Sequence, residues 1–391
     1  MKKCQIIIIL CLDFLISSKT SIAQTWSDAS VFPTTAARIN TVDFFSSTFS
    51  LAGGYLGFNP VRFKSFDGGQ NWSSFSSTLN YETFDFHIFS STEILASASA
   101  GVFRSTDGGV NFTQVSFPGY SINGRLAFAN TTTGWHIGTN NSGSSYIYYT
   151  SNGGTSWSSQ IPASFGVALN DVACFSANNA WIVGEQGLIN ATTDGGNNWF
   201  VQTSGVTSHL NGIHFISLTT GVAVGNNGVI LRTTDGGTTW STITSNTTES
   251  LNDVHFTTTT EGWIVGNNGT VLKTIDGGLT WTAETSGTTE HLYEVDFLNP
   301  FVGLAVGANC KAIRYQGNCT ETNTVSYTHC GAYYWGGQNR PTSGQYVATF
   351  SNQYGCDSTV TLNLTVLPLG ASTITAAACD SYSLNGETYT F

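Results

Sequence analysis

The sequence predicts an all-β fold, a seven-bladed propeller, from three observations. An eight-residue motif recurs six times at nearly constant spacing, the segments between its copies repeat one pattern of short apolar runs and turns, and charged residues make up only 9% of the 391 residues. Many short strands and turns with few charges are typical of folded all-β proteins. A tail of different composition follows the repeats.

The first 23 residues are expected to be a signal peptide. Lys2 and Lys3 precede an apolar run that ends at Ile16, and small residues lead up to Ala23. This is the layout of a secretory signal cleaved after Ala23, and the run is too short to span a bilayer. No later segment approaches the roughly 20 apolar residues of a membrane-spanning helix. We therefore expect residues 24–391 to be secreted or held at the outer cell surface, with no membrane-spanning segment.

The expected mature chain is strongly acidic. The whole sequence has a formal charge of −11, and its first 23 residues carry +2 from three lysines and one aspartate, so the remainder carries −13. Such a chain is a poor candidate for binding nucleic acid or anionic lipid through its bulk charge.

The recurring motif divides the chain into units of about forty residues. Its clearest copies are "TTDGGTTW" and "TIDGGLTW", and the copies follow one another at steps of 40, 45, 42, 41 and 41 residues. The third residues are Asp67, Asp107, Asn152, Asp194, Asp235 and Asp276, and the last residues are Trp72, Phe112, Trp157, Trp199, Trp240 and Trp281. Such regular spacing indicates a repeat architecture.

Each unit has the pattern of one propeller blade. The segment "LNDVHFTTTTEGWIVGNNGTVLKTIDGGLTW", residues 251–281, contains two short strands, an Asn-Gly turn of the type I′ kind, a third strand and the motif, after which a Trp opens a fourth strand. A seventh unit from Leu292 has three strands and no motif, whereas "QTWSDASVF" from Gln24 offers a fourth strand without the first three. We therefore predict seven blades, with the N-terminal strand closing the ring.

The motif S/T-x-D-x-G-x-x-W is the Asp-box, or BNR-type repeat, of sialidases, sortilin-type receptors, some xyloglucan hydrolases and the photosystem II stability and assembly factors. The stretch "GWIVGNNGTVLKTIDGGLTW" most resembles the last of these, and the resemblance covers residues 24–317. It implies the propeller fold but not the ligand, because the matching residues are the scaffold. An exported protein also gives no reason to expect a photosystem.

The Asp-box residues are interpreted as structural. An aspartate before two glycines can accept backbone N–H bonds across a tight turn, and the aromatic residue can pack between blades. Asn152 keeps an acceptor oxygen but cannot act as a base or a strong metal ligand, and Phe112 keeps the bulk of Trp without its N–H. Both substitutions preserve a turn rather than a chemical function.

Two further sets of residues recur at fixed places in the blades. The basic column, three residues before the box aspartate, consists of Lys64, Arg104, Arg232, Lys273 and Arg314. It could form a belt that docks an acidic partner, as an arginine-rich patch does in the assembly-factor relatives, or a solvated strand position that offsets the box aspartates. Tyr149 and Ala191 interrupt it, which favours the second interpretation.

The second set lies near the end of the innermost strands and consists of Asp43, Asp85, His214, His255 and Asp296. These side chains could bind a metal ion or a sugar in the central channel, or they could be hydrogen-bonded links between blades. No spacing demands a metal, so no metal or cofactor is assigned.

No catalytic residue can be named from the sequence. The Arg-Ile-Pro signature of sialidases, the Gly-Lys phosphate loop, His-Glu-x-x-His and the nucleophile elbow are all missing. We expect a secreted or cell-surface, non-catalytic binding or adhesion protein with an unidentified protein or glycan partner. The alternative is a polysaccharide-binding or polysaccharide-degrading propeller with a site over the channel near His214 and His255.

The tail is expected to form small β-sandwich-like repeats, one over residues 318–370 and a truncated second copy over 371–391. Cys330 opens the first copy and Cys379 the second, and the pattern resembles repeats of secreted surface proteins from Bacteroidetes-type bacteria. Cys330 and Cys356 are the preferred disulfide, among the many pairings allowed by the six cysteines that follow the expected signal peptide. Cys310 and Cys319 flank a strand and are not expected to pair.

Overall fold

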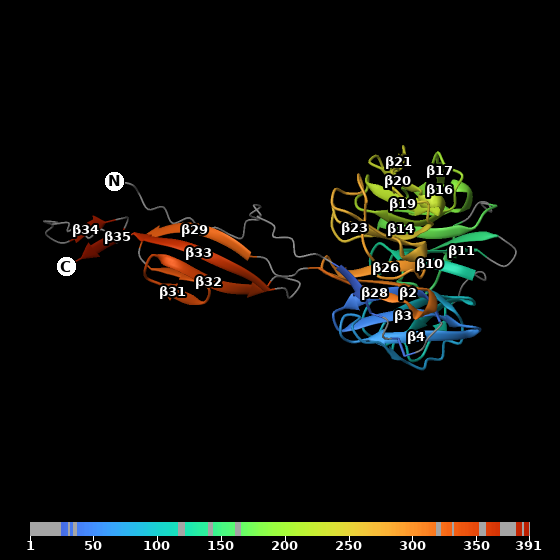
Figure 1. The fold of residues 1–391 in the computed structure, drawn as a ribbon, viewed down its shortest axis with the longest axis horizontal. Coiled ribbons are helices and arrows are strands. Elements are labelled where there is room, and N and C mark those ends of the chain that lie inside the picture. Colours follow the sequence, from blue (N-terminus) through green and yellow to red (C-terminus); the bar gives the residue numbers. More distant parts are fainter. Residues whose placement is uncertain are drawn as a thin grey trace. The chain divides into compact units, whose positions relative to one another are not determined.

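The computed structural model describes residues 25–29, 32–33, 37–115, 122–139, 144–160, 166–317, 322–330, 332–351, 357–367, 381–384 and 387–390. The chain divides into a propeller unit, Ile22–Gly317, and a second unit that contains Asn318–Phe391 (Figure 1). No helix among the described residues has both the length and the apolar character needed to cross a membrane.

The propeller unit contains seven four-stranded antiparallel sheets, which we number as blades 1 to 7. Blades 1 to 3 are β2 (Arg38–Ser46), β3 (Phe49–Leu56), β4 (Asn59–Ser65) and β5 (Ser73–Ser74); β6 (Thr83–Ile88), β7 (Ile94–Ala98), β8 (Gly101–Ser105) and β9 (Thr113–Gln114); and β10 (Ile122–Phe128), β11 (Gly134–Thr139), β12 (Ser145–Thr150) and β13 (Ser158–Ser159). Blades 4 and 5 are β14 (Leu169–Ser176), β15 (Asn179–Gly184), β16 (Ile189–Thr192) and β17 (Phe200–Gln202); and β18 (Leu210–Phe215), β19 (Gly221–Gly225), β20 (Ile230–Thr233) and β21 (Ser241–Ile243). Blades 6 and 7 are β22 (Leu251–Phe256), β23 (Gly262–Gly266), β24 (Val271–Thr274) and β25 (Thr282–Ala283); and β26 (Leu292–Asn299), β27 (Val302–Gly307), β28 (Ala312–Gln316) and β1 (Thr25–Asp28). The predicted all-β propeller is confirmed.

The N-terminal strand completes the last blade, as predicted. Strand β1 pairs antiparallel with β28, so that Trp26 lies opposite Tyr315. The Trp26 side chain is only 5% exposed and its Nε1 donates a hydrogen bond of 2.9 Å to Glu284 in the connection that follows blade 6. On the inner side, the Phe44 N–H of blade 1 donates to Asp296 of blade 7 at 2.8 Å. Strand β1 therefore completes blade 7 and contacts blade 6 at the outer edge, while the Phe44–Asp296 bond joins blades 7 and 1 at the inner edge.

The turns between the second and third strands explain the repeated "GNNG" sequence. They contain the short 3₁₀ segments η1 (Glu185–Gly187), η2 (Asn226–Gly228), η3 (Asn267–Gly269) and η4 (Ala308–Cys310). In blade 5 the central residues Asn227 and Gly228 have φ of 60° and 69°. Positive φ at both positions is the geometry of the predicted type I′ turn, which Asn and Gly adopt at low cost.

The apolar core lies between neighbouring blades. One cluster, for example, combines Val222 and Val224 of blade 5 with Val254, Ile264 and Trp281 of blade 6. The box residue Trp281 thus packs in the apolar layer between two sheets. Burial of such aromatic surface stabilises the packing of one blade on the next.

The second unit begins with a three-stranded sheet. Strand β33 (Asp357–Leu367) lies between β29 (Thr322–Cys330), to which it is parallel, and β32 (Gly344–Ser351), to which it is antiparallel. Two hairpins accompany it, β30 (Tyr333–Trp335) with β31 (Gln338–Arg340), and β34 (Ser381–Leu384) with β35 (Glu387–Thr390). The Cys330 side chain, Cys356 and Cys379 lie outside the described residues, whereas Cys174 and Cys310 carry no disulfide.

Candidate functional site

The innermost strands place two rings of side chains around the propeller axis. The upper ring is defined as the strand position that Asp253 occupies in blade 6, where it lies opposite Val265 of the second strand. The lower ring is the position two residues further on, which His255 occupies opposite Trp263. The upper ring consists of Thr41, Asp85, Arg125, Asp171, Gly212, Asp253 and Glu294. The lower ring consists of Asp43, His87, Ala127, Ala173, His214, His255 and Asp296.

The alignment of Asp85 made from the sequence was wrong. Asp85 lies opposite Ser97, which is the upper-ring position, and His87 occupies the lower-ring position opposite Leu95. The segment "FDFHIF" contains two overlapping matches to the apolar-charged-apolar pattern of this strand. A β-bulge between Thr83 and Asp85, of the kind that recurs in other blades, selects the second match.

A salt bridge crosses the upper ring. Arg125 Nη1 of blade 3 donates to Glu294 Oε2 of blade 7 at 2.7 Å, and the same atom donates to the Phe84 carbonyl at 3.1 Å. The Thr41 hydroxyl lies 3.2 Å from Glu294 Oε1 and 3.5 Å from Asp85 Oδ1. Side chains of four blades therefore meet at the axis. The sequence interpretation did not identify Arg125, because blade 3 has no acidic or histidine residue at either ring position.

Burial, together with the charges of neighbouring groups, shifts the pKa values of the carboxyl groups and of Arg125 in the upper ring. Burial raises the pKa of Asp85 to about 6 against the attraction of Arg125, and burial together with the charge of Asp253 raises that of Asp171 to about 7. Burial also raises the pKa of Glu294 well above its ordinary value. Burial alone would lower the pKa of Arg125, but Glu294 and the neighbouring aspartates raise it. The upper ring is thus a proton-retaining acidic cluster with a permanent cation inside it.

The aspartates of both rings connect neighbouring blades. Each accepts a hydrogen bond from a backbone N–H of the next innermost strand. The pairs are Asp43 with Ile88 (2.9 Å), Asp85 with Leu126 (2.7 Å), Asp171 with Ile213 (2.8 Å), Asp253 with Val295 (2.9 Å) and Asp296 with Phe44 (2.8 Å). Of the two interpretations of Asp43, Asp85 and Asp296, these contacts favour links between blades.

The histidines of the lower ring are held neutral by burial. Burial lowers the pKa of His214 to about 4, and burial with the proximity of His214 lowers that of His255 to about 3. Their ring centroids lie 5.3 Å apart, and His255 Nδ1 is 3.5 Å from Asp296 Oδ1. Within the described part of the chain, no group of three or more His, Cys, Asp or Glu side chains is arranged to hold a metal ion.

The Asp-box aspartates make the hydrogen bonds of a turn. Asp235 Oδ1 accepts bonds from the Thr233 hydroxyl (2.8 Å) and the Thr239 N–H (2.9 Å), and its Oδ2 accepts one from the Thr239 hydroxyl (2.7 Å). These bonds stabilise the ionised carboxylate and lower the pKa of Asp235 to about 2. Asn152 accepts the equivalent bonds from Thr150 and from the Ser156 N–H through its Oδ1.

Most of the basic column also acts between blades. Arg104, Arg232 and Arg314 donate to the carbonyl of the first box glycine of the next blade, namely Gly153 (3.1 Å), Gly277 (2.7 Å) and Gly68 (3.4 Å) respectively. Where the column is interrupted, Gln160 and Gln202 make the same contact to Gly195 and Gly236. Lys273 is 9% exposed and lies 3.2 Å from the Tyr315 hydroxyl, while Lys64 lies over the Phe75 ring. These contacts account for the column without an acidic partner.

Comparisons with known proteins agree with this scaffold. The family described as "Photosynthesis system II assembly factor YCF48" matches residues 111–204, 163–249 and 238–300. The chain is an Asp-box propeller that resembles the assembly factor YCF48. The structure of YCF48 from Cyanidioschyzon merolae is 18% identical with a TM-score of 0.62, and the match covers 75% of this chain and 99% of that one. A structure of YCF48 bound to D1 peptide is 19% identical with a TM-score of 0.63, covering 75% and 97%.

The YCF48-like propeller also has the fold of longer enzymes. An ancestral GH74 enzyme is 15% identical with a TM-score of 0.60, and the match covers 84% of this chain but only 53% of the enzyme. The match to the Niastella koreensis GH74 enzyme covers 51% of that enzyme, at 13% identity and a TM-score of 0.52. At these identities the likeness establishes the fold alone. None of the curated proteins compared with the chain matches it.

Proposed function

We propose that the chain is an exported, non-catalytic binding protein whose YCF48-like propeller holds a segment of another protein. The observation that carries the proposal is that the carboxyl groups of the upper ring already bind other groups of the propeller. Asp85, Asp171 and Asp253 accept backbone N–H bonds from the next blade, and Glu294 is paired with Arg125. Hydrolysis of a glycosidic bond needs two carboxyl groups that face the substrate as acid and base. Groups already engaged in holding blades together are poor candidates for that role.

The comparisons support a protein ligand more than a sugar. This chain matches YCF48 over nearly the whole length of that protein, and one YCF48 structure contains a bound D1 peptide. Its match to the GH74 enzymes covers only about half of each enzyme. A single propeller that binds an extended peptide is the function nearest to these observations.

The proposal is tested with residues 24–391 and with a His214→Ala, His255→Ala double variant. Both proteins are incubated with xyloglucan and other polysaccharides, applied to a glycan array, and panned against a phage-displayed library of random peptides. We expect peptides that bind both proteins, and no binding or cleavage of any sugar. Sugar binding or cleavage that the double variant loses would replace this proposal with a channel-based polysaccharide function. Export is tested by mass spectrometry of protein recovered from outside the cells. A chain that begins at Gln24 is expected.

A further inference from the structure

The outermost strand of blade 4 differs from those of the other blades. The residue after the box aromatic is Phe200, whereas the equivalent residues are Ser73, Thr113, Ser158, Ser241 and Thr282. Val201 follows where blade 5 has Thr242, and the Phe200 and Val201 side chains are 57% and 77% exposed. Exposed edge strands usually carry polar residues that discourage pairing with another chain. Blade 4 has the opposite character at its edge.

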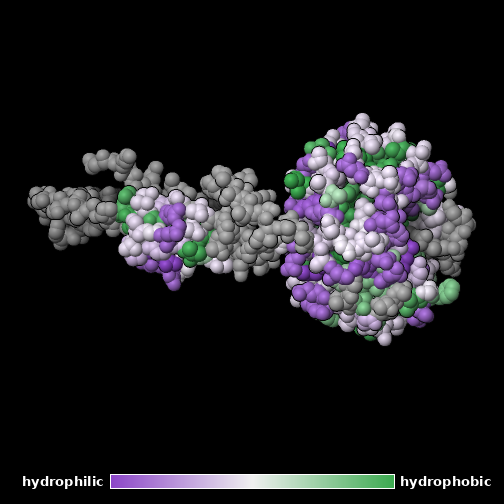
Figure 2. Space-filling model, in the orientation of Figure 1, coloured by the Kyte–Doolittle hydropathy of each residue, from purple (hydrophilic) through white to green (hydrophobic). Residues whose placement is uncertain are grey.

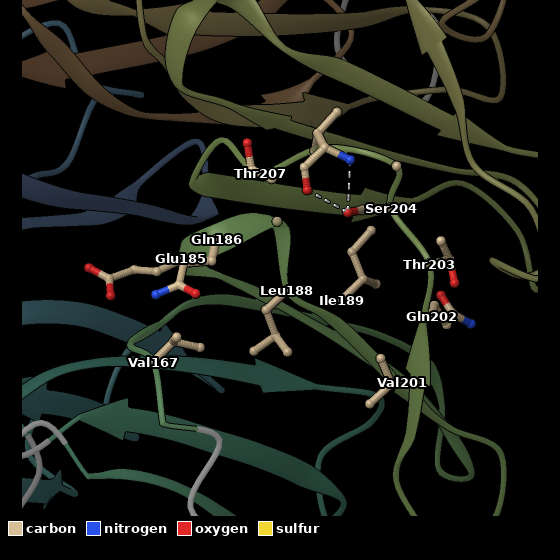
Figure 3. A pocket seen from close by; sticks show the side chains of 13 residues that line it. Val167, Glu185, Gln186, Leu188, Ile189, Val201, Gln202, Thr203, Ser204 and Thr207 are labelled. Atoms are coloured by element: carbon tan, nitrogen blue, oxygen red, sulfur yellow. Dashed lines mark hydrogen bonds between the residues drawn. The ribbon is translucent and has the colours of Figure 1, made fainter.

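A groove runs beside this apolar edge. It has a volume of about 440 Å³ and lies between the turn η1 and the chain that continues from β17. Figure 3 shows the side chains of Leu188 and Val201 along the groove, with Glu185 at the end away from Val201. Ile189 also lines the groove, but its side chain is buried in the core between the blades. In Figure 2, hydrophobic residues gather along the upper margin of the propeller, where Figure 1 labels β16 and β17. Val201 belongs both to the edge strand and to the lining of the groove. Phe200 precedes it in the strand, so its side chain points to the opposite face of the sheet.

The free edge of β17 supplies hydrogen-bonding groups for an added strand. In blade 4 the sheet order is β14-β15-β16-β17, so one side of β17 has no strand partner in the sheet. Among the described residues no strand covers the backbone groups on that side, so they can pair with an extended peptide, and alternate side chains of the peptide can then enter neighbouring pockets.

Charge indicates which kind of peptide fits. Glu185 is the only charged residue among the described residues that line the groove, and 39% of its side chain remains exposed despite a 3.6 Å contact with His209. The expected mature chain carries −13, which opposes pairing with a second copy of itself and favours a cationic partner.

We propose that the edge of β17 and the adjacent groove bind an extended protein segment that has apolar residues at alternate positions and a lysine or arginine opposite Glu185. This inference rests on the proposed function, because it assigns the surface that a peptide-binding propeller would use.

The test compares variants of the full mature chain against peptides selected from the phage library on the wild type. The Phe200→Ser, Val201→Thr double variant copies the residues of blade 5 and should fold as that blade does. Leu279→Thr is the matched control, because it removes an exposed apolar side chain from the box of blade 6 and also copies blade 5. We expect selected peptides with the stated pattern, binding weakened about tenfold or more by the double variant, a smaller loss with Glu185→Gln, and no change with Leu279→Thr.

Peptides that bind the wild type and the double variant equally would overturn this inference and leave the proposed function standing. Failure to select any peptide would count against both. Sedimentation equilibrium addresses the other occupant: a dimer of the wild type that the double variant abolishes would assign the surface to a second copy of the chain and overturn the peptide proposal.

Discussion

Arg125 of β10 and Glu294 of β26 meet across the propeller axis, with Nη1 2.7 Å from Oε2, although they belong to blades 3 and 7. Only 26% of the Arg125 side chain and 14% of the Glu294 side chain is exposed. A charge pair withdrawn from water to this extent is costly to break, since the remaining partner is left without compensation. The pair also brings one positive charge into a ring that contains three aspartates, so its effect reaches beyond Glu294.

We therefore expect Arg125→Met to destabilise the propeller strongly at pH 8. The expected loss in the free energy of unfolding is about 3–5 kcal/mol, the range for removing one partner of a buried ion pair. At pH 4.5 the loss should be smaller, because the ring carboxyl groups with raised pKa are then protonated and need no counter-charge. Urea denaturation followed by tryptophan fluorescence at both pH values measures the difference.

Arg38→Met is the control for this experiment. Arg38 likewise belongs to an innermost strand, β2, but its guanidinium lies 4.0 Å from the Tyr293 ring centroid and donates to Asn40. Its loss should be modest and similar at both pH values. An equal loss at both pH values for Arg125→Met would show that packing, and not charge compensation, is the role of that side chain.

The aspartates should give the pH dependence of stability two limbs. The pKa of Asp171 is raised to about 7 by burial and by Asp253, so the folded chain keeps a proton that the unfolded chain releases above about pH 4. The stability from this group is complete below pH 4 and is lost as the pH rises to about 7. The pKa values of Asp107 and Asp235 are lowered to about 2 by their turn hydrogen bonds, so their contribution is lost as the pH falls from about 4 towards 2.

Thermal denaturation between pH 2 and pH 8 tests both limbs. The neutral His214 and His255, whose pKa values are lowered by burial to about 4 and about 3, add an opposing contribution that is lost as the pH falls from about 6.5 towards 4. The limb of Asp171 is therefore measured as the difference between the wild type and a variant. Asp171→Asn, which stays neutral and can still accept the Ile213 N–H bond, should flatten the limb between pH 5 and pH 7 and leave the acid limb unchanged. A variant that keeps the full wild-type slope above pH 5 would contradict the assignment of that limb to Asp171.

Substitutions of Asp235 should separate turn formation from charge. Asp235→Asn retains an oxygen that can accept the bonds from Thr233 and Thr239, as Asn152 does in blade 3, but it loses the negative charge that strengthens them. Its melting temperature at pH 7 should therefore fall only slightly. Asp235→Ala leaves the turn donors without an acceptor and should lower the melting temperature distinctly. Equal losses for the two variants would mean that the negative charge itself is required.

The sequence predicts the scaffold better than the site. The repeated boxes, the Asn-Gly turns and the incomplete last unit predict the blades and their closure, because each is a local pattern that one blade repeats from another. Asn152 and Phe112 also indicate the structural role of the box, since they keep its geometry and lose its chemistry.

The rings at the axis are harder to predict, because their contacts join residues far apart in the sequence. Arg125 and Glu294 are 169 positions apart, and the two segments have little in common beyond a Phe three residues further on. A β-bulge that recurs in the innermost strands also decides which of Asp85 and His87 enters which ring. The only sign of the Arg125–Glu294 salt bridge in the sequence is an arginine at the same strand position as four acidic residues. This alignment can be made only when the position of the β-bulge is known.

Closure of the ring by the N-terminal strand depends on Trp26. Its ring packs against Phe297 and Tyr315, with centroids 6.0 and 5.4 Å away, and its Nε1 bonds to Glu284. Trp26→Ala should therefore cost about 3–5 kcal/mol, as for other buried Trp truncations. Trp26→Phe keeps the aromatic packing and loses one hydrogen bond, so about 1 kcal/mol is expected. Hydrogen exchange of the alanine variant should show faster exchange in β28 than in β20, because only the former pairs with the displaced strand. Uniformly faster exchange in all seven blades would instead mean that the propeller unfolds as a single cooperative unit when its closing strand is released.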